Sequence, residues 1–261
     1  MNHAPRAWEV TIHRHAKPKD AYFIEGLPGI GNVGKVVVDY LIEQTKTKKL
    51  ASLFSPSLPN SVFVNEDNQV SLPNIEVHYT TINGQDYLFM TGDVQPSDEV
   101  ASYQFCEAVI DHAQQWDVKR IITLGGIGLQ EEPERPIVYC TGNDKDFIAR
   151  FTGKGASKEV YGKVGPIIGV SGLLLGIAQR VKLPAITLLA ETLGHPMYLG
   201  LKGARVILEL LTETLGIAVP LDDLDQEIAD LDKEDDGDQG KHTKLESINR
   251  LKRYKDTNYI G

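Results

Sequence analysis

Short apolar runs followed by helical stripes organise the first 200 residues of the chain. The run AYFIEG (residues 21–26) is typical of a buried strand, and it ends in glycine. The apolar positions after it recur on one face of a helix, and they are Val33, Val36, Val37, Tyr40 and Leu41. Asn32 stands immediately before them and can cap the first turn. The sequence therefore predicts a strand, a glycine turn and a helix in this order.

The same order returns in the second half of the chain. We predict a helix over residues 97–116, followed by a strand over 120–124 that ends in several glycines. Further on we predict a strand over 166–168, a turn at Gly169 and Gly172, a helix over 173–181 and a last strand over 185–194. Strands that alternate with helices indicate a largely parallel sheet.

Between these units the pattern is that of antiparallel strands. The run LASLFS (50–55) is apolar, and alternating segments up to residue 92 flank the pair Asn83-Gly84, which is a strong hairpin signal. We therefore predict an α/β fold, with a mostly parallel or mixed sheet and helices on both faces. Ligands of open sheets of this kind bind beyond the carboxyl ends of the strands.

The last forty residues have a different character. Residues 222–238 carry ten carboxylates against one lysine, whereas residues 241–255 carry six basic residues against one glutamate. Each block also has a helical apolar stripe, and the stripes are Leu221, Leu224, Ile228 and Leu231, then Leu245, Ile248, Leu251 and Tyr254. We predict a core domain over residues 1–220 and a charged helical appendage with a C-terminal tail over 221–261, which either contacts a partner or packs on its own domain.

Composition and charge exclude several classes of protein. With 41% hydrophobic and 24% charged residues among 261, the chain is an ordinary globular protein, and it has no 18-residue apolar run and no signal peptide. We therefore expect a cytoplasmic protein. A formal charge of −9 argues against binding to nucleic acid or to anionic membranes. Cys106 and Cys140 are too few for a disulfide framework and are not spaced as metal ligands.

The stretch GLPGIGNVGK (26–35) satisfies two phosphate-binding templates. Gly29, Gly31 and Gly34 spell G-x-G-x-x-G, and Gly29, Gly34 and Lys35 spell G-x-x-x-x-G-K. Val36 stands where a P-loop needs Ser or Thr, and no ribose-binding carboxylate follows about 20 residues later. A tight turn that lets helix and sheet approach each other explains the glycines equally well.

A helix amino terminus is nevertheless a local anion site, so a small carboxylate or phosphate could bind there. The residues that we expect to line such a crevice are Gly29, Gly31, Asn32, Gly34, Gly126, Gly128 and Ser171.

Other candidates for chemistry are weak, and we predict no catalytic residue, no metal and no cofactor. GVSG (169–172) lacks the second glycine of a nucleophile elbow, because Leu173 stands there. His195 near Glu191 could act as an acid or base, but a packed loop histidine is the simpler interpretation. Glu131, Glu132 and Glu134 are better explained as a solvated loop. His13 and His15 share a strand face but lack a third metal ligand.

Taken in order, several segments resemble the proteasome assembly chaperone family, of the second-chaperone type, and in particular its stand-alone archaeal and bacterial members. These segments are GLPGIGNVGK with VVDYLI, SLPNSVFV, FMTGDVQPSD, TLGGIGL and GPIIGVSGLLLG, and they span residues 21–200. The resemblance implies a fold similar to that of purine nucleoside phosphorylases without its established catalysis. It also implies homo-oligomers and a chaperone role toward proteasome α subunits.

Some members of this family bind the α ring through a tail that ends in a hydrophobic residue, tyrosine and any residue. Here Tyr259 is third from the end rather than second, which moves the terminal carboxylate by about 3.5 Å relative to the ring. The residues expected to contact a partner are Leu245, Ile248, Leu251, Tyr254, Tyr259, Ile260 and Gly261.

Three functions are consistent with the sequence. The first is a non-enzymatic, homo-oligomeric chaperone-like protein that binds proteasome α subunits or a related assembly. The second is a ligand-binding protein or an enzyme that acts on a nucleoside or a phosphorylated metabolite in the glycine-lined crevice. The third is a structural subunit of a hetero-oligomer whose partner supplies the activity.

Overall fold

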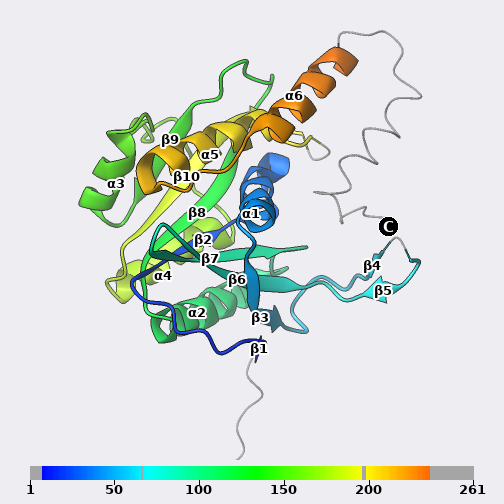
Figure 1. Ribbon diagram of the computed structural model, residues 1–261, viewed down its shortest axis with the longest axis vertical. Helices are drawn as coiled ribbons and strands as arrows, with labels where there is room; N and C mark the ends of the chain where they lie inside the picture. The colour runs from blue at the N-terminus through cyan, green and yellow to red at the C-terminus, as the bar shows by residue number, and fades with distance from the viewer. Residues whose placement is uncertain (1–7, 66, 196–197, 236–261) are drawn as a thin grey trace, which may run out of the picture.

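A computed structural model of the protein describes residues 8–65, 67–195 and 198–235, and it is built around one large mixed sheet (Figure 1). The sheet has eight strands in the order β1-β3-β6-β7-β2-β8-β10-β9. In chain order they are β1 (Glu9–Ile12), β2 (Ala21–Glu25), β3 (Lys48–Phe54), β6 (Ile75–Ile82), β7 (Gln85–Gly92), β8 (Val118–Leu129), β9 (Val138–Gly142) and β10 (Ala185–Leu193). A separate two-stranded hairpin consists of β4 (Phe63–Val64) and β5 (Val70–Ser71).

The centre of the sheet is parallel and its flanks are antiparallel. Strands β7, β2, β8 and β10 run in the same direction, while β1, β3 and β6 on one side and β9 on the other pair antiparallel with their neighbours. The predicted mixed α/β sheet is therefore confirmed. The carboxyl ends of the four parallel strands meet at one edge of the sheet, which we call the carboxyl edge.

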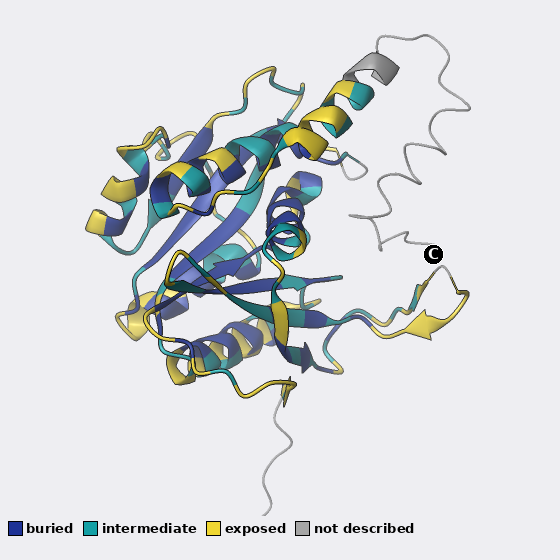
Figure 2. Ribbon diagram, in the orientation of Figure 1, coloured by how far each residue is buried: buried dark blue, intermediate teal, exposed yellow. Residues whose placement is uncertain are grey.

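Helices cover both faces of the sheet, as Figure 1 shows. They are α1 (Val33–Gln44), α2 (Glu99–Gln115), α3 (Lys145–Thr152), α4 (Val170–Arg180), α5 (Leu201–Leu215) and α6 (Asp222–Asp235). One hydrophobic core lies between the sheet and α1, α3, α5 and α6, and the other lies between the sheet and α2 and α4. Side chains alternate between them along β2, because Tyr22 and Ile24 belong to the first core and Phe23 to the second. The buried strands form the dark middle layer of Figure 2.

Two of the local signals in the sequence are confirmed in detail. Asn83 and Gly84 have φ of 51° and 80°, as a two-residue hairpin turn requires, and they join β6 to β7 with Ile82 opposite Gln85. The predicted helix over residues 97–116 is α2, and Asp98 caps it by accepting a 2.8 Å hydrogen bond from the backbone N–H of Ala101.

Two predicted strand boundaries are wrong. The strand after α2 does not stop at Leu124 but continues through the glycines to Leu129, because β10 pairs with it in parallel from Ile121 to Leu129. Residues 166–168 form no strand and lie in a loop without a neighbouring strand. Helix α4 begins at Val170, so that Gly172 lies inside the helix rather than in a turn.

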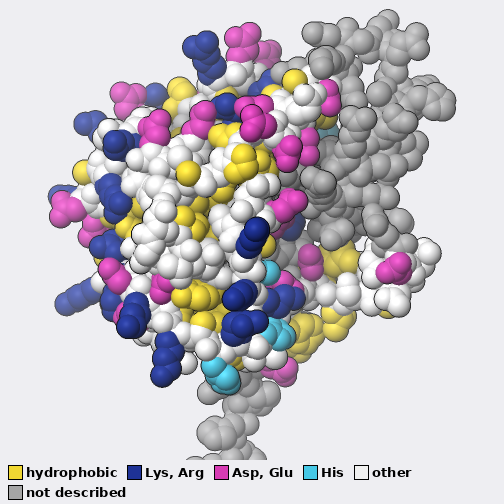
Figure 3. Space-filling view, viewed as in Figure 1, with side chains coloured by type: hydrophobic (Ala, Val, Ile, Leu, Met, Phe, Trp, Pro, Cys, Tyr) yellow, Lys and Arg dark blue, Asp and Glu magenta, His cyan; other side chains and the backbone are white. Residues whose placement is uncertain are grey.

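The acidic part of the predicted appendage is a helix that packs on the body of the protein. Leu224 of α6 is fully buried in the first core, and Arg205 of α5 donates hydrogen bonds to Asp225. Acidic side chains gather over this region in Figure 3. The second stripe (Leu245 to Tyr254) and the tail (Tyr259 to Gly261) lie outside the described residues. In the part of the chain that the structure describes, no helix is long and apolar enough to cross a membrane.

We expect Leu224→Ala to lower the free energy of unfolding by about 2–4 kcal/mol, because it leaves a cavity between α6 and the core. Urea unfolding followed by circular dichroism measures the change. Gln226→Ala, on the exposed side of the same helix, is the control and should change it by less than about 0.5 kcal/mol. Equal stability of the two variants would contradict the packing of α6 on the core.

Candidate functional site

The predicted glycine crevice lies at the carboxyl edge, where the turn after β2 meets the ends of β8 and β10. The turn contains the short 3-10 helix η1 (Ile30–Asn32), and it leads directly into α1. Gly31 and Asn32 both adopt left-handed conformations, with φ of 60° and 49°. The turn therefore needs glycine at position 31, and it holds Asn32 in a conformation that asparagine tolerates.

Protein atoms occupy the space beside most of these glycines. A Cβ atom on Gly34 would lie 2.4 Å from the carbonyl oxygen of Leu124, and one on Gly126 would lie 2.3 Å from that of Ile30. A Cβ atom on Gly31 would lie 2.8 Å from the hydroxyl oxygen of Thr192. The glycines thus allow α1, β8 and β10 to approach more closely than residues with a side chain would permit.

The remaining crevice residues are distributed along the same edge. A Cβ atom on Gly128 would lie 2.9 Å from the Cα of Gly194, so this glycine also serves close packing. Gly29 is exposed, and its nearest neighbour would be Gln95 at 3.9 Å, which leaves open space beside it. The predicted cap at Asn32 is wrong, because this residue has a left-handed backbone conformation and its side chain makes no capping hydrogen bond. Its backbone N–H donates to the carbonyl of Gly29.

Lys35, which the P-loop template would aim at a phosphate, is an internal ion-pair partner. It is buried, and its ammonium lies 2.9 Å from the carboxylate of Asp39, one turn further along α1. Thr91 of β7 donates a 2.5 Å hydrogen bond to the same carboxylate. The lysine charge is therefore compensated within the fold. Asp39 lies at the i+4 position, a spacing that signals such a pair in the sequence.

Ser171 lies at the amino end of α4 and contacts a buried carboxylic acid that sequence reasoning missed. Glu25, the last residue of β2, is fully buried, and its two oxygens accept hydrogen bonds of 2.9 Å from the backbone N–H of Leu27 and from the Ser171 hydroxyl. Burial raises the pKa of Glu25 to about 7, although both hydrogen bonds favour the carboxylate. The signal in the sequence is the single acid in the apolar run AYFIEG.

Gln95, which follows β7, joins the glycine turn to α4. Its side-chain N–H donates to the carbonyl of Pro28 at 2.5 Å, and its side-chain oxygen accepts a hydrogen bond from the backbone N–H of Val170 at 3.1 Å. Gly169 has φ of 91°, and a Cβ atom there would lie 2.8 Å from that oxygen. Glu25 and Gln95 thus fix the start of α4 against the turn before α1.

Three of the other candidates from the sequence have structural partners. Glu191 accepts hydrogen bonds of 3.0 Å from the hydroxyl of Tyr139 and from the backbone of Ile137. Glu132 accepts a hydrogen bond from Tyr198, and His13 shares one with Ser52. Among the described residues there is no group of three side chains that could hold a metal ion.

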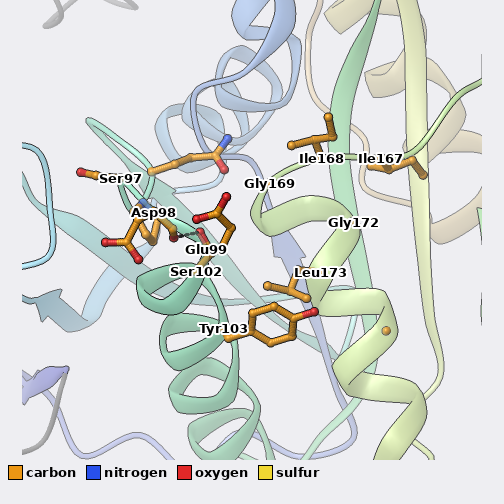
Figure 4. Close-up of a pocket in the computed structure, with 13 residues that line it drawn as sticks. Ser97, Asp98, Glu99, Ser102, Tyr103, Ile167, Ile168, Gly169, Gly172 and Leu173 are labelled. Carbon is orange, nitrogen blue, oxygen red and sulfur yellow. Dashed lines mark hydrogen bonds between the residues drawn. The ribbon is translucent and has the colours of Figure 1, made fainter.

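Beside this edge an open groove runs between the amino-terminal halves of α2 and α4 (Figure 4). Its volume is about 570 Å³. Ser102 and Tyr103 line it from α2, whereas Gly172 and Leu173 line it from α4, as Figure 4 shows. Ser102 donates its hydroxyl proton to the backbone carbonyl of Asp98 at 2.8 Å. We call this feature the α2–α4 groove.

This geometry defines the class of the protein: it is an α/β protein in which glycines close the carboxyl edge of the sheet. Residues 23–235 match the PAC2 family, and the chain belongs to that family. The resemblance to proteasome assembly chaperones that the ordered glycine segments indicated is thereby confirmed.

Relatives of the chain include archaeal proteins. The uncharacterized protein MJ1210 of Methanocaldococcus jannaschii is 26% identical over 208 residues, which are 80% of this chain and 79% of that protein. PbaB of Pyrococcus furiosus, described as an archaeal proteasome activator, has a TM-score of 0.81 and 29% identity, over 87% of this chain and 97% of that one. PbaA of the same organism, described as an archaeal homolog of proteasome-assembly chaperone, has a TM-score of 0.73. At 21% identity, over 97% of this chain and 99% of PbaA, this similarity shows the fold alone.

We expect Gly34→Ala to destabilise the protein by about 1–3 kcal/mol, because its Cβ atom would press on the backbone of β8. Gly176→Ala is the matched control, since Gly176 is also a helical glycine but has open space around its Cα. That substitution should stabilise the protein by about 0.5–1 kcal/mol. Thermal and urea unfolding measure both changes, and a neutral Gly34→Ala would refute the close approach of α1 and β8.

Glu25→Gln should remove a pH dependence of stability. Because the folded pKa of about 7 lies above the ordinary 4.5, ionisation of Glu25 costs the wild type stability as the pH rises from about 4.5 to 7. The stability of the variant relative to the wild type should therefore increase by about 2–3 kcal/mol between pH 5 and pH 8. Urea unfolding at both pH values measures it.

Asp225→Asn is the control for that comparison. Hydrogen bonds from Arg205 hold the pKa of Asp225 below its ordinary value, so this carboxylate is ionised in the folded and unfolded states throughout the range. The stability difference between Asp225→Asn and the wild type should be the same at pH 5 and pH 8. A flat difference for Glu25→Gln as well would mean that Glu25 titrates normally.

Proposed function

We propose that the protein is a non-enzymatic, chaperone-like cytoplasmic protein that forms homo-oligomers and binds proteasome α subunits or a related assembly. The observation that carries the proposal is the similarity to PbaB, at 29% identity over 87% of this chain. That protein is described as a proteasome activator, and membership of the PAC2 family points in the same direction.

The geometry of the carboxyl edge supports a function through surface contacts. In many open α/β sheets this edge is where a ligand binds. Here protein atoms fill the space that side chains on three of the glycines would need, and these atoms belong to the backbones of Leu124 and Ile30 and to the side chain of Thr192. Lys35 is paired with Asp39. The atoms that would otherwise form a phosphate site thus contribute to packing.

Residues 221–261 are the part of the chain that we assign to the partner. We keep 1–220 as the core domain, and the described part of the appendage, α6, is anchored to α5 through Leu224 and Asp225. The basic stripe (Leu245, Ile248, Leu251 and Tyr254) and the tail (Tyr259, Ile260 and Gly261) follow. An amphipathic segment that leads to a tyrosine-containing terminus suits insertion into a groove or pocket of another protein.

The alternative is a ligand or substrate at the outer end of the glycine turn. The open space beside Gly29 favours it, because a small anion could reach the amino end of α1 there. A nucleoside or a phosphorylated metabolite is the class that this position would suit. The closed packing at Gly31, Gly34 and Gly126 leaves this hypothesis less room than the motif alone indicates.

Deletion of residues 241–261 should weaken retention of proteasome α subunits by at least tenfold in a pull-down with the immobilised protein. The physical reason is that the deletion removes both the basic apolar stripe and the tail. Titration by surface plasmon resonance with α subunits of the same organism measures the effect.

Single substitutions in the tail sharpen this test. Tyr259→Ala should reproduce most of the loss, because it removes the one aromatic ring of the last four residues, whereas Asn258→Ala should bind like the wild type. If the deletion binds as well as the full chain, the tail is not the contact. If the wild type retains no α subunit, the proposed partner is wrong.

A further inference from the structure

The β4–β5 hairpin projects from the body of the protein, and Figure 1 shows it extending away from the large sheet. We call residues 62–72 the arm. Four of its aliphatic side chains are largely exposed: Val62 at 54%, Val64 at 66%, Val70 at 68% and Leu72 at 58%. Neither hydrophobic core includes any of them. The arm thus carries an apolar surface that the rest of the described chain does not cover.

These four side chains lie on one face of the hairpin. Val64 pairs with Val70, and Phe63 pairs with Ser71, so the same register places Val62 opposite Leu72. Since successive residues of a strand point to opposite faces, Val62, Val64, Val70 and Leu72 share one face, and Phe63 and Ser71 share the other. We call the first the aliphatic face of the arm. No charged residue occurs in 62–65 or 69–72.

Side-chain hydrogen bonds hold the turn of the arm, although no other part of the described chain packs on the aliphatic face. The side-chain oxygen of Asn65 accepts hydrogen bonds from the backbone N–H of Asp67 at 3.1 Å and of Gln69 at 2.9 Å. An isolated two-stranded hairpin is only marginally stable in water. A hairpin with a specified turn and a uniformly aliphatic face is therefore expected to pack against another surface.

The α2–α4 groove is a second surface that the rest of the described chain leaves uncovered, and Tyr103, Ile167, Ile168 and Leu173 are apolar side chains in its lining. Ile168 at its rim is 89% exposed, and Tyr103 is half exposed. Gly176 leaves open space in the groove, because a Cβ atom there would have no neighbour within 4 Å, whereas the space beside Gly172 is occupied by the backbone carbonyl of Ile167. The groove can therefore admit side chains from outside.

The segment that leads into the arm contacts the rim of the groove. The backbone N–H of Ser97, which lines the groove, donates to the carbonyl of Ser57 at 3.5 Å, and Leu58 before the arm is buried. The arm projects from this contact, so that a second copy related by a twofold axis could receive it in its groove. Both apolar surfaces would then be covered in a closed, symmetric dimer.

We propose that the aliphatic face of the arm lies in the α2–α4 groove of a second copy of this chain, and that the exchange is reciprocal. The inference rests on the self-association included in the proposed function and adds its location. The strands of the arm (62–65 and 69–72) carry no charge, so they place no like charge beside Asp98 and Glu99 at the rim of the groove. The acidic residues of the arm, Glu66 and Asp67, lie between the two strands in the sequence.

The size of the surfaces favours a second copy in this arrangement. Thirteen residues line the groove, and ten described residues form the arm, which together approach the roughly 20–30 residues per partner of a stable interface. Two arms packed only on each other would contribute four aliphatic side chains per copy, which is far below that size. Reciprocal insertion thus accounts for both surfaces at once.

Val64→Glu combined with Val70→Lys should raise the dissociation constant of the dimer at least tenfold, as measured by sedimentation velocity over a dilution series. The two new side chains face each other across the hairpin and can form an ion pair, so the arm keeps its fold and the chain its net charge. Ser71→Lys, on the opposite face of the arm, is the control and should leave the dissociation constant unchanged.

Disulfide trapping locates the contact. The two natural cysteines, Cys106 and Cys140, are buried, so introduced thiols are the accessible ones. A Val64→Cys chain mixed with a Tyr103→Cys chain should give a covalent dimer that contains both, visible on a non-reducing gel. A dimer made only of Val64→Cys chains would instead show that two arms pack on each other, and it would overturn the proposal.

The outcomes separate this inference from the proposed function. If the wild type self-associates and the double variant does so equally well, the arm is not the interface, whereas homo-oligomerisation stands. If the double variant keeps its dissociation constant but loses retention of proteasome α subunits, the arm serves that partner, and the inference fails. If the wild type is monomeric at all concentrations, both the inference and homo-oligomerisation are refuted, and binding to α subunits is still decided by the pull-down.

Discussion

The close approach of the α1 backbone to the centre of the sheet is the constraint on which the rest of the structure depends. Side chains on Gly26 and Gly34 would lie within 2.1 and 2.4 Å of the carbonyl oxygens of Gly34 and Leu124, so strand, helix and strand touch through backbone alone. This contact sets the depth of α1 in the first core and places η1 over the ends of β8 and β10. The carboxyl edge is therefore closed by the same glycines that suggest a nucleotide site.

A second consequence concerns the other face of the sheet. The turn that the glycines create offers the carbonyl of Pro28 to Gln95 and the backbone N–H of Leu27 to Glu25, and these two side chains in turn hold the first residues of α4. The position of α4 relative to α2, and with it the shape of the α2–α4 groove, thus depends on polar contacts buried at the carboxyl edge.

The parts of the fold that depend on local chemistry were predictable from the sequence. The Asn83-Gly84 hairpin and the helix after the glycine turn each follow from residues close together in the chain, whereas the predicted side-chain cap at Asn32 is not formed. The extension of β8 to Leu129 was not, because its glycines have poor strand propensity and only pairing with β10 holds them in the sheet. Glu25 was missed for a similar reason, since the hydroxyl that pairs with it lies 146 positions away in the sequence.

The carboxyl edge of the sheet is closely packed, whereas two surfaces elsewhere on the chain are exposed and partly apolar. Where a ligand would be expected, backbone packs on backbone, and the charged groups Lys35 and Glu25 have partners within the fold. Where solvent would be expected, the arm presents an aliphatic face, and a groove with open space beside Gly176 lies between two helices. Backbone thus fills the site that a small molecule would use, whereas surfaces that a polypeptide can use are exposed. This distribution of packed and exposed residues favours recognition of another polypeptide chain as the function of the protein.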